Sequence, residues 1–169
     1  EEDLDLVEIE TGDADDAPVS DDFVAPTDEE PDIIPDEDTD TTPLTNPINV
    51  PYFCQFKNTQ YPAETSGNTS LAMLLYFYGW VGTPDDLTAA WGKDKAQSPE
   101  GLAEMFNSYS GTTGMVLVPH LDGTFSEIKS LIDQGKPVIA HTWFTPAGHV
   151  IIINGYTETG YFTNDPAGV

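Results

Sequence analysis

The clearest apolar pattern lies in the second part of the chain. There, Leu71, Leu74, Leu75 and Tyr78 recur at spacings of three and four residues, which predicts a helix over residues 67–78. Capping signals predict the starts of three further helices, because in each a hydroxyl residue precedes either a proline or an acid that belongs to the first turn. These starts are Thr83-Pro84, Ser98-Pro99 and Thr124, and the last opens an amphipathic helix that reaches Gln134.

Short apolar runs predict four strands, at residues 115–118, 137–143, 149–156 and 161–164. Glycines at 155 and 160 mark the turn between the last two. Since the helices come first and the closely spaced strands follow, the sequence predicts an α+β domain with N-terminal helices packed on an antiparallel sheet.

The charge divides the chain near residue 46. Residues 1–40 hold 19 of the 30 acids and no base, and the first base is Lys57. The rest of the chain, with 11 acids and five lysines, has an ordinary balance. So acidic a segment, rich in Thr and Pro, cannot bury enough apolar surface to offset its ordering entropy. We therefore predict an acidic, disordered tail or linker over residues 1–46 and a folded domain over residues 47–169.

Two short apolar clusters interrupt this acidic segment, at residues 4–9 and at Ile33-Ile34. They leave open whether the segment is a plain linker or docks on a partner or on the domain's own surface. Asp36, Asp38 and Asp40 alternate like the start of a calcium loop, but neither the expected glycine nor a closing glutamate follows, which argues against calcium.

Composition excludes several classes of function. A formal net charge of −25 with five Lys and no Arg argues against nucleic acid as the main partner and against docking on an anionic membrane. No apolar run approaches the roughly 20 residues of a membrane-spanning helix. The opening EEDLDL has neither the basic nor the apolar stretch of a signal peptide. With Cys54 as its single cysteine, the chain can form no internal disulfide and no cysteine-based metal site.

Candidate chemistry lies at the ends of the predicted elements. His149 opens the apolar strand Val150–Ile153, a place that suits a rigidly held general base, although this feature alone favours a hydrogen-bonded structural histidine. Asp165 lies sixteen residues on, across one hairpin, where its carboxylate can orient the imidazole or simply form a turn.

The start of the first predicted helix is the second place where chemistry is expected. Ser66 stands there, and a helix N-terminus favours an anionic nucleophile and offers N–H groups to an oxyanion. Ordinary capping by Ser or Thr explains the same residues. Gln55, eleven residues earlier, carries a side-chain amide that can donate a second oxyanion hydrogen bond.

Five stretches, in the same order, resemble one family. They are residues 50–55 (VPYFCQ), 66–73 (SGNTSLAM), 135–140 (GKPVIA), 148–150 (GHV) and 164–166 (NDP). Together they resemble the papain-like cysteine peptidases of the bacteriocin-processing, double-glycine leader type and their secreted and phage relatives. The resemblance covers residues 48 to 169 and implies a papain-like fold.

The resemblance also implies a mechanism without metal or cofactor. The residue at position 66 would attack the scissile carbonyl, His149 would act as the base, Asp165 would fix its tautomer, and Gln55 would help to hold the oxyanion. His141, Trp143 and Phe144, just before the histidine motif, are expected to line the substrate cleft, although ordinary packing explains the two aromatic residues equally well. His120 follows Pro119 in a predicted loop and receives no role.

The departure from the family is Ser66, where the family has its nucleophilic cysteine. Three interpretations follow: an active enzyme disabled by a Cys-to-Ser change, a natural pseudoenzyme that binds peptide or cell-wall material, and a working serine hydrolase. Cys54 is a poor alternative nucleophile, because it lies on an extended segment and not at a helix start. A purely structural virion or surface domain is the remaining class.

By analogy with the family, the expected partner is a peptide or a peptidoglycan peptide, and the expected location is extracellular or virion-associated. The family usually continues beyond the Asn-Asp-Pro turn, so we expect the chain to be part of a longer protein or assembly.

Overall fold

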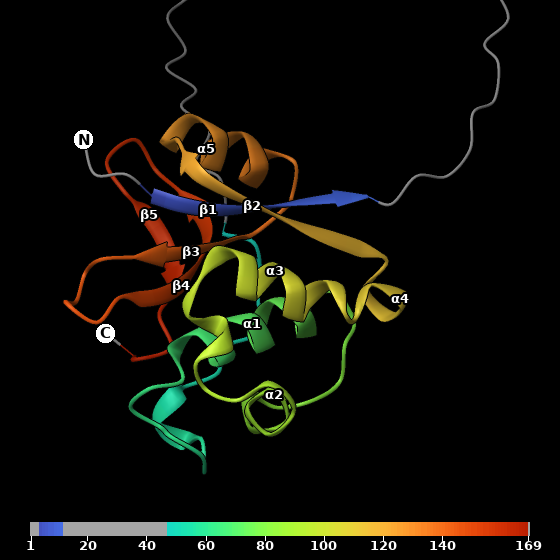
Figure 1. The fold of residues 1–169 in the computed structure, drawn as a ribbon. Coiled ribbons are helices and arrows are strands. Elements are labelled where there is room, and N and C mark those ends of the chain that lie inside the picture. The colour runs from blue at the N-terminus through green and yellow to red at the C-terminus, as the bar shows by residue number, and fades with distance from the viewer. Residues whose placement is uncertain (1–3, 12–46, 169) are drawn as a thin grey trace, which may run out of the picture.

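The computed structural model describes residues 4–11 and 47–168. Its centre is a five-stranded antiparallel sheet of order β2-β1-β3-β4-β5 (Figure 1). The strands are β1 (Leu4–Thr11), β2 (Met115–Gly123), β3 (Val138–Thr142), β4 (His149–Tyr156) and β5 (Tyr161–Asn164). The register pairs Ile139 of β3 with Ile152 of β4 and Ile152 with Asn164 of β5. The end of β3, the start of β4 and the end of β5 therefore lie at the same edge of the sheet.

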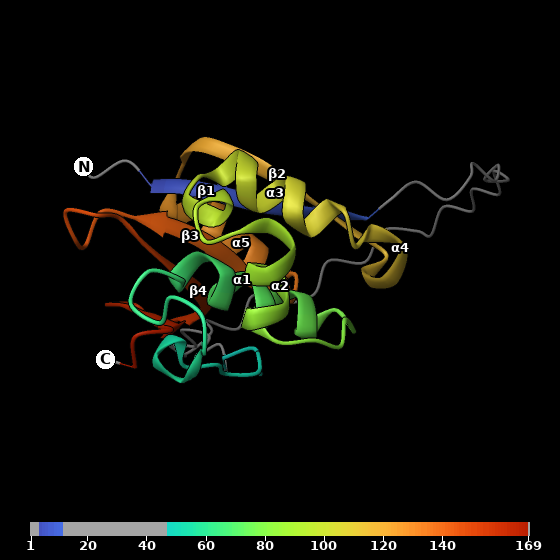
Figure 2. The ribbon, with the colours of Figure 1, turned by 60° about the horizontal axis from the view of Figure 1, so that its bottom comes forward.

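Helices cover both faces of this sheet (Figures 1 and 2). They are the 3-10 helices η1 (Gln55–Lys57) and η2 (Lys95–Gln97) and the α-helices α1 (Ser66–Phe77), α2 (Pro84–Trp91), α3 (Pro99–Asn107), α4 (Ser110–Thr113) and α5 (Phe125–Asp133). Helix α1 packs on β4 and α3 on β2, whereas α5 packs on β3 and β4 from the other side.

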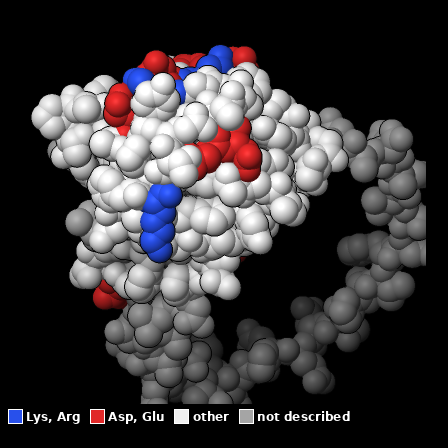
Figure 3. Space-filling model, turned by 90° about the horizontal axis from the view of Figure 1, so that it is seen from below, with Lys and Arg blue, Asp and Glu red and all other residues white. Residues whose placement is uncertain are grey.

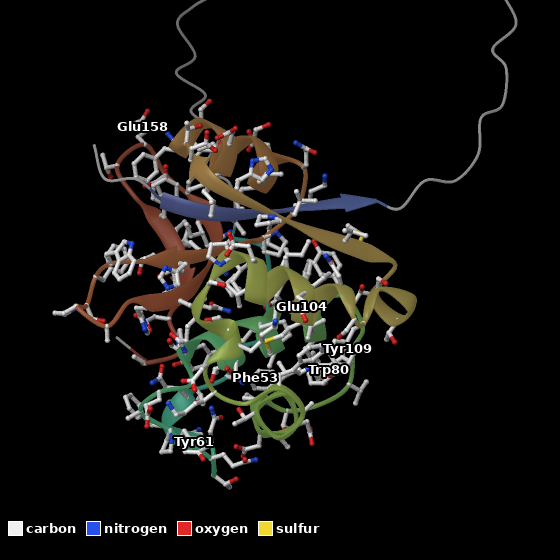
Figure 4. All side chains as sticks on the ribbon, viewed as in Figure 1. Phe53, Tyr61, Trp80, Glu104, Tyr109 and Glu158 are labelled. Atoms are coloured by element: carbon white, nitrogen blue, oxygen red, sulfur yellow. The ribbon has the colours of Figure 1, made fainter. Side chains whose placement is uncertain are left out.

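Successive residues of β4 face two different cores. Val150 and Ile152 join the larger apolar cluster, which is built around α1 and α3. Ile151 and Ile153 join a smaller cluster with α5. Burial on both faces explains why this strand is a continuous apolar run and not an alternating one. The larger cluster extends to Trp80 and Tyr109, whose ring centroids lie 5.4 Å apart with the planes inclined by 58° (Figure 4).

The predicted α+β class is confirmed, and the predicted helices and the last three strands are found within one or two residues of their expected bounds. Local capping explains this agreement: Thr83 and Thr124 each accept a hydrogen bond from a first-turn backbone N–H, and each belongs to a complete capping box.

Two expectations need correction. Strand β2 runs to Gly123, so Pro119 and His120 lie in a strand and not in a loop. A proline is tolerated there because β2 is an edge strand, on which every second N–H has no ladder partner. The second correction concerns residues 4–11, which form β1 between β2 and β3 and not a solvated tail. Acidic and apolar residues alternate over residues 4–6 and again over residues 7–10, a strand pattern that the high charge density obscured.

The remaining predictions for the acidic segment lie outside the described residues. They concern the linker over residues 12–46, the Ile33-Ile34 cluster and the calcium alternative at Asp36, Asp38 and Asp40. Within the described domain the surface seen in Figure 3 is mostly uncharged; lysines and acids mix at its top edge, and a basic patch and an acidic patch stand nearer the middle of the face. None of the helices in residues 4–11 and 47–168 is long and apolar enough to cross a membrane.

Candidate active site

One cavity of about 710 Å³ brings four predicted site residues together: Gln55, Ser66, His149 and Asp165 all line it. They come from η1, the start of α1, the start of β4 and the turn after β5. The cavity therefore lies where the helical layer meets the ends of the sheet, and segments 110 residues apart in sequence contribute to it.

Ser66 is the first residue of α1 and is 8% exposed. The residue before it, Thr65, makes no side-chain cap for the helix. Its hydroxyl instead accepts a hydrogen bond from the Asn58 side chain at 3.0 Å and donates one to the Tyr61 carbonyl at 3.0 Å. Within the described residues, Thr65 therefore leaves the first N–H groups of α1 without a side-chain cap, and such N–H groups attract a negatively charged group.

Two local contacts fix the start of α1. The Asn58 side chain also donates to the Thr69 hydroxyl at 2.9 Å, which joins the preceding loop to the first turn. Gly67 packs directly on η2, because a Cβ there would lie 2.2 Å from the carbonyl oxygen of Ala96. Glycine is therefore required by close approach of two backbones, and this approach sets the wall of the cavity beside Ser66.

His149 and Asp165 form a direct pair. His149 Nε2 lies 2.8 Å from Asp165 Oδ1, and the two side chains are 13% and 16% exposed. The carboxylate accepts, so the neutral imidazole carries its proton on Nε2 and leaves Nδ1 as the basic nitrogen. No hydrogen bond joins the Ser66 hydroxyl to the His149 ring, although both side chains line the same cavity.

The turn that carries Asp165 is held from two directions. Asp165 Oδ1 also accepts a hydrogen bond from the backbone N–H of Ala167 at 2.7 Å. The backbone N–H of Gln55 donates to the Pro166 carbonyl at 2.8 Å. The position of Gln55 is thus coupled by one backbone hydrogen bond to the position of Asp165.

The side-chain amide of Gln55 is oriented by the loop before α1. Its Nε2 donates to the Pro62 carbonyl at 3.0 Å, and the residue is 4% exposed. An amide nitrogen has two hydrogens, so one remains for a second acceptor. Gln55 Oε1 is buried without a hydrogen-bond partner among the described residues.

A buried hydroxyl links the helix of Ser66 to the strand of His149. Ser70, one turn into α1, donates to the Val150 carbonyl at 2.8 Å, and both residues are fully buried. On the strand side, Thr142 donates to the His149 carbonyl at 3.0 Å. These two bonds tie the first residues of β4 to α1 and to β3.

The three expected substrate-binding residues lie in different surroundings. Phe144 lines the cavity. His141 is buried at 5% exposure, with its ring 5.2 Å from that of Trp143, and neither of these two residues lines the cavity. Trp143 is exposed on the loop between β3 and β4. A substrate role for these three residues stays a prediction.

Sequence reasoning missed the opposite rim of the cavity. Lys93 there pairs with Glu64 at 2.7 Å and with Asp94 at 2.8 Å, and these carboxylates raise the pKa of its ammonium group. Gln97 completes this rim by donating to the Glu64 and Lys93 carbonyls. No sequence signal identifies these residues, because only the tertiary fold brings the start of α1 next to η2.

Cys54 does not line the cavity that holds His149, so its position gives no support to the alternative nucleophile. It lies beside Tyr52. The hydroxyl of Tyr52 packs against Gly168, since a Cβ added to this glycine would lie 3.2 Å from it. Partial burial, then Cys54 and Asp165, raise the pKa of Tyr52, so this phenol stays neutral near pH 7. In the described residues, no group of three or more His, Cys, Asp or Glu is placed to hold a metal ion.

Comparison with known proteins gives one match. The model of the Peptidase_C39 like family matches residues 47–169, which is more than two thirds of the chain. Neither the search of curated proteins nor the search of solved structures returned a match.

Proposed function

Because the chain belongs to the Peptidase_C39 like family, which assigns it a peptidase-like function in general, we propose that this cavity is a cysteine-peptidase-type site for peptide bonds, with Ser66 at the nucleophile position. The observation that carries the proposal is the single cavity shared by Gln55, Ser66, His149 and Asp165, with the hydrogen-bonded His149–Asp165 pair inside it.

The proposed steps follow from the hydrogen bonds. His149 Nδ1 takes the proton of the nucleophile at position 66, which attacks the carbonyl carbon of the scissile bond. The same proton then passes to the leaving amine, so an acyl-enzyme forms and the amine departs. Asp165 holds the ring and stabilises the imidazolium that forms between these two transfers.

The oxyanion is assigned to two donors. One is the backbone N–H of Ser66 at the uncapped start of α1, and the other is the second N–H of the Gln55 side chain, whose orientation the Pro62 carbonyl fixes. A water molecule then enters on the side that the amine has left and attacks the acyl carbon, with His149 as the base that takes its proton.

Ser66 determines how well this machinery works. A serine hydroxyl is far less acidic than a thiol, and an imidazole that is suited to a thiolate–imidazolium pair activates it poorly. We therefore assign the active mechanism to a cysteine at position 66, and the Ser66 protein is expected to bind peptide with little or no turnover.

The experiment compares the Ser66 protein with Ser66→Cys on mixed peptides and on peptidoglycan peptides, with products identified by mass spectrometry. Hydrolysis that appears with Ser66→Cys and falls at least about a hundredfold when His149→Ala is added supports the proposal. Hydrolysis that survives His149→Ala contradicts the mechanism.

The second candidate is a natural pseudoenzyme that uses the cavity as a peptide- or cell-wall-binding module. The serine at the nucleophile position favours this candidate, because it leaves the cavity in place without a thiol. A Ser66→Cys protein that binds these peptides but cleaves none of them would support this alternative. We propose an extracellular or virion-associated location for either function, which immunolocalisation of the native protein would test.

A further inference from the structure

One residue of the loop between η1 and α1 has an unusual backbone conformation. Tyr61 has a φ of +46°, and in the described part of the chain it is the one residue other than glycine with a positive φ (Figure 4). A side chain as bulky as that of tyrosine opposes this left-handed conformation, and the proline that follows favours an extended one. Such a conformation persists only where the surroundings impose it, and such outliers concentrate at functional sites.

Hydrogen bonds on both sides of Tyr61 impose this conformation. Before it, the backbone N–H of Thr59 donates to the Asp85 carboxylate at the start of α2, at 2.9 Å. After it, the Tyr61 carbonyl accepts from the backbone N–H of Glu64 at 2.9 Å, which closes a turn, and from the Thr65 hydroxyl at 3.0 Å. Tyr61 therefore joins a segment that is fixed to α2 to a segment that is fixed at the start of α1.

The same turn presents a carbonyl group to the candidate active site. Pro62, the second residue of the turn, accepts a hydrogen bond from Gln55 Nε2 at 3.0 Å. Gln55 Oε1 has no partner among the described residues, so the Pro62 carbonyl is the group there that orients this amide. Gln55 lines the cavity whereas Tyr61 does not, so an effect of Tyr61 on the reaction would pass through Gln55.

The ring of Tyr61 adds less to the turn than its backbone does. The ring is 52% exposed, and Lys93 Nζ lies 5.8 Å from its centroid. A cation over an aromatic ring is attracted only weakly at an exposed position. The conformation of the backbone at residue 61 is therefore the feature on which the direction of the Pro62 carbonyl depends.

Resting on the proposed function, we propose that Tyr61 is a positioning residue for the oxyanion donor, because its left-handed backbone places the Pro62 carbonyl where it holds the Gln55 amide. The Pro62 carbonyl binds one hydrogen of Gln55 Nε2 and leaves the other for the oxyanion. A residue at position 61 that resists a positive φ moves the Pro62 carbonyl away, and the Gln55 amide then loses its fixed orientation.

Two variants separate the backbone of residue 61 from its ring. Tyr61→Val and Tyr61→Asn both remove the ring, but valine strongly opposes a positive φ, whereas asparagine adopts it readily. If Tyr61→Val does not fold, Tyr61→Ala takes its place, since alanine also disfavours this conformation.

The first measurement needs no turnover and uses the Ser66 protein. Nitrogen–proton NMR spectra follow the side-chain amide of Gln55, whose signals are assigned by their loss in Gln55→Glu. We expect Tyr61→Val to raise the hydrogen-exchange rate of this amide at least about tenfold and Tyr61→Asn to leave it within about threefold of the parent, with the backbone amides of α5 unchanged in both. Equal rates in the two variants, whether raised or not, would overturn the proposal.

The second measurement uses the kinetics of Ser66→Cys. An oxyanion donor acts in the transition state, so Tyr61→Val should lower kcat about tenfold or more and leave KM within about threefold. In a protein that carries both Gln55→Ala and Ser66→Cys, Tyr61→Val should cause no further loss of kcat, because its effect passes through Gln55. A further loss of the same size would show that Tyr61 acts independently of Gln55 and would refute the assignment.

Failure of this inference differs from failure of the proposed function. If Ser66→Cys hydrolyses no peptide, the proposed mechanism fails, and the NMR comparison still decides whether Tyr61 positions the Gln55 amide. If Ser66→Cys is active and Tyr61→Val changes neither the exchange rate nor kcat, the mechanism stands and the role of Tyr61 is wrong.

Discussion

The hydroxyl of Ser70 allows a direct measurement of how tightly the helix of Ser66 is joined to the strand of His149. Ser70→Ala removes the 2.8 Å bond to the Val150 carbonyl and little else, because the alanine side chain fits wherever a serine does. Both residues are fully buried, so water cannot replace the lost donor.

The expected loss in the free energy of unfolding is about 1–2 kcal/mol, since one buried hydrogen bond contributes about 1 kcal/mol and its loss leaves a lone pair of a buried carbonyl unmet. For a domain of this size that loss lowers Tm by roughly 3–10 °C. Urea unfolding followed by circular dichroism should give a lower midpoint with an unchanged m-value.

Ser108→Ala is the matched control. Ser108 ends α3 and donates only to the Met105 carbonyl three residues earlier in its own helix, so its bond holds no second element in place. That variant should change stability by about 0.5 kcal/mol or less. A Ser70→Ala protein as stable as the Ser108→Ala protein would show that the Ser70 bond does not join α1 to β4.

Three further predictions concern stability. Asp85 accepts hydrogen bonds from two backbone amides and one hydroxyl, which lower its pKa. The contribution of these bonds to the free energy of unfolding should be complete above the unfolded-state pKa of about 3.9 and be lost as pH falls through the lower folded-state pKa. Asp85→Asn should remove this pH dependence from acid-unfolding curves. Gly67→Ala should destabilise the domain by about 2 kcal/mol or more in urea unfolding, because its Cβ would lie 2.2 Å from the Ala96 carbonyl oxygen, and a variant as stable as the parent would contradict that contact. Burial raises the pKa of Tyr78 to about 12, and its hydroxyl has no hydrogen-bond partner among the described residues, so the free energy of unfolding should fall as pH rises from 10 towards 12. Tyr78→Phe should lose that fall and be as stable as the parent, or slightly more so, at pH 7.

Local signals explain which parts of the fold the sequence reveals. The helix starts at Thr83 and Thr124 are predicted correctly because a hydroxyl and an acid in the first turn create a bonding pattern that needs no distant partner. Strand β1 was missed because its formation depends on β2 and β3, which lie more than 100 residues away. Its own composition, with acids at positions 5, 8 and 10, resembles that of the segment around it.

The candidate site also has a part that the sequence reveals and a part that it does not. His149 and Asp165 follow from a hairpin, whose length and register place them close together once the strands are known. The rim of Lys93 and Glu64 does not follow, because it depends on the contact between Gly67 and Ala96, which only the three-dimensional structure shows.

The contacts that hold the start of α1 involve the residues around Ser66 and not its own side chain, and this bears on what Ser66→Cys can do. Asn58 fixes the side chain of Thr65, Gly67 sets the approach of η2, and the Gln55 backbone is tied to the turn of Asp165. None of these contacts uses the Ser66 hydroxyl, and that side chain lines the cavity. A cysteine at position 66 should therefore take the place of the serine without moving His149, and activity gained by that one substitution would reflect the chemistry of the thiol and not a rearranged site.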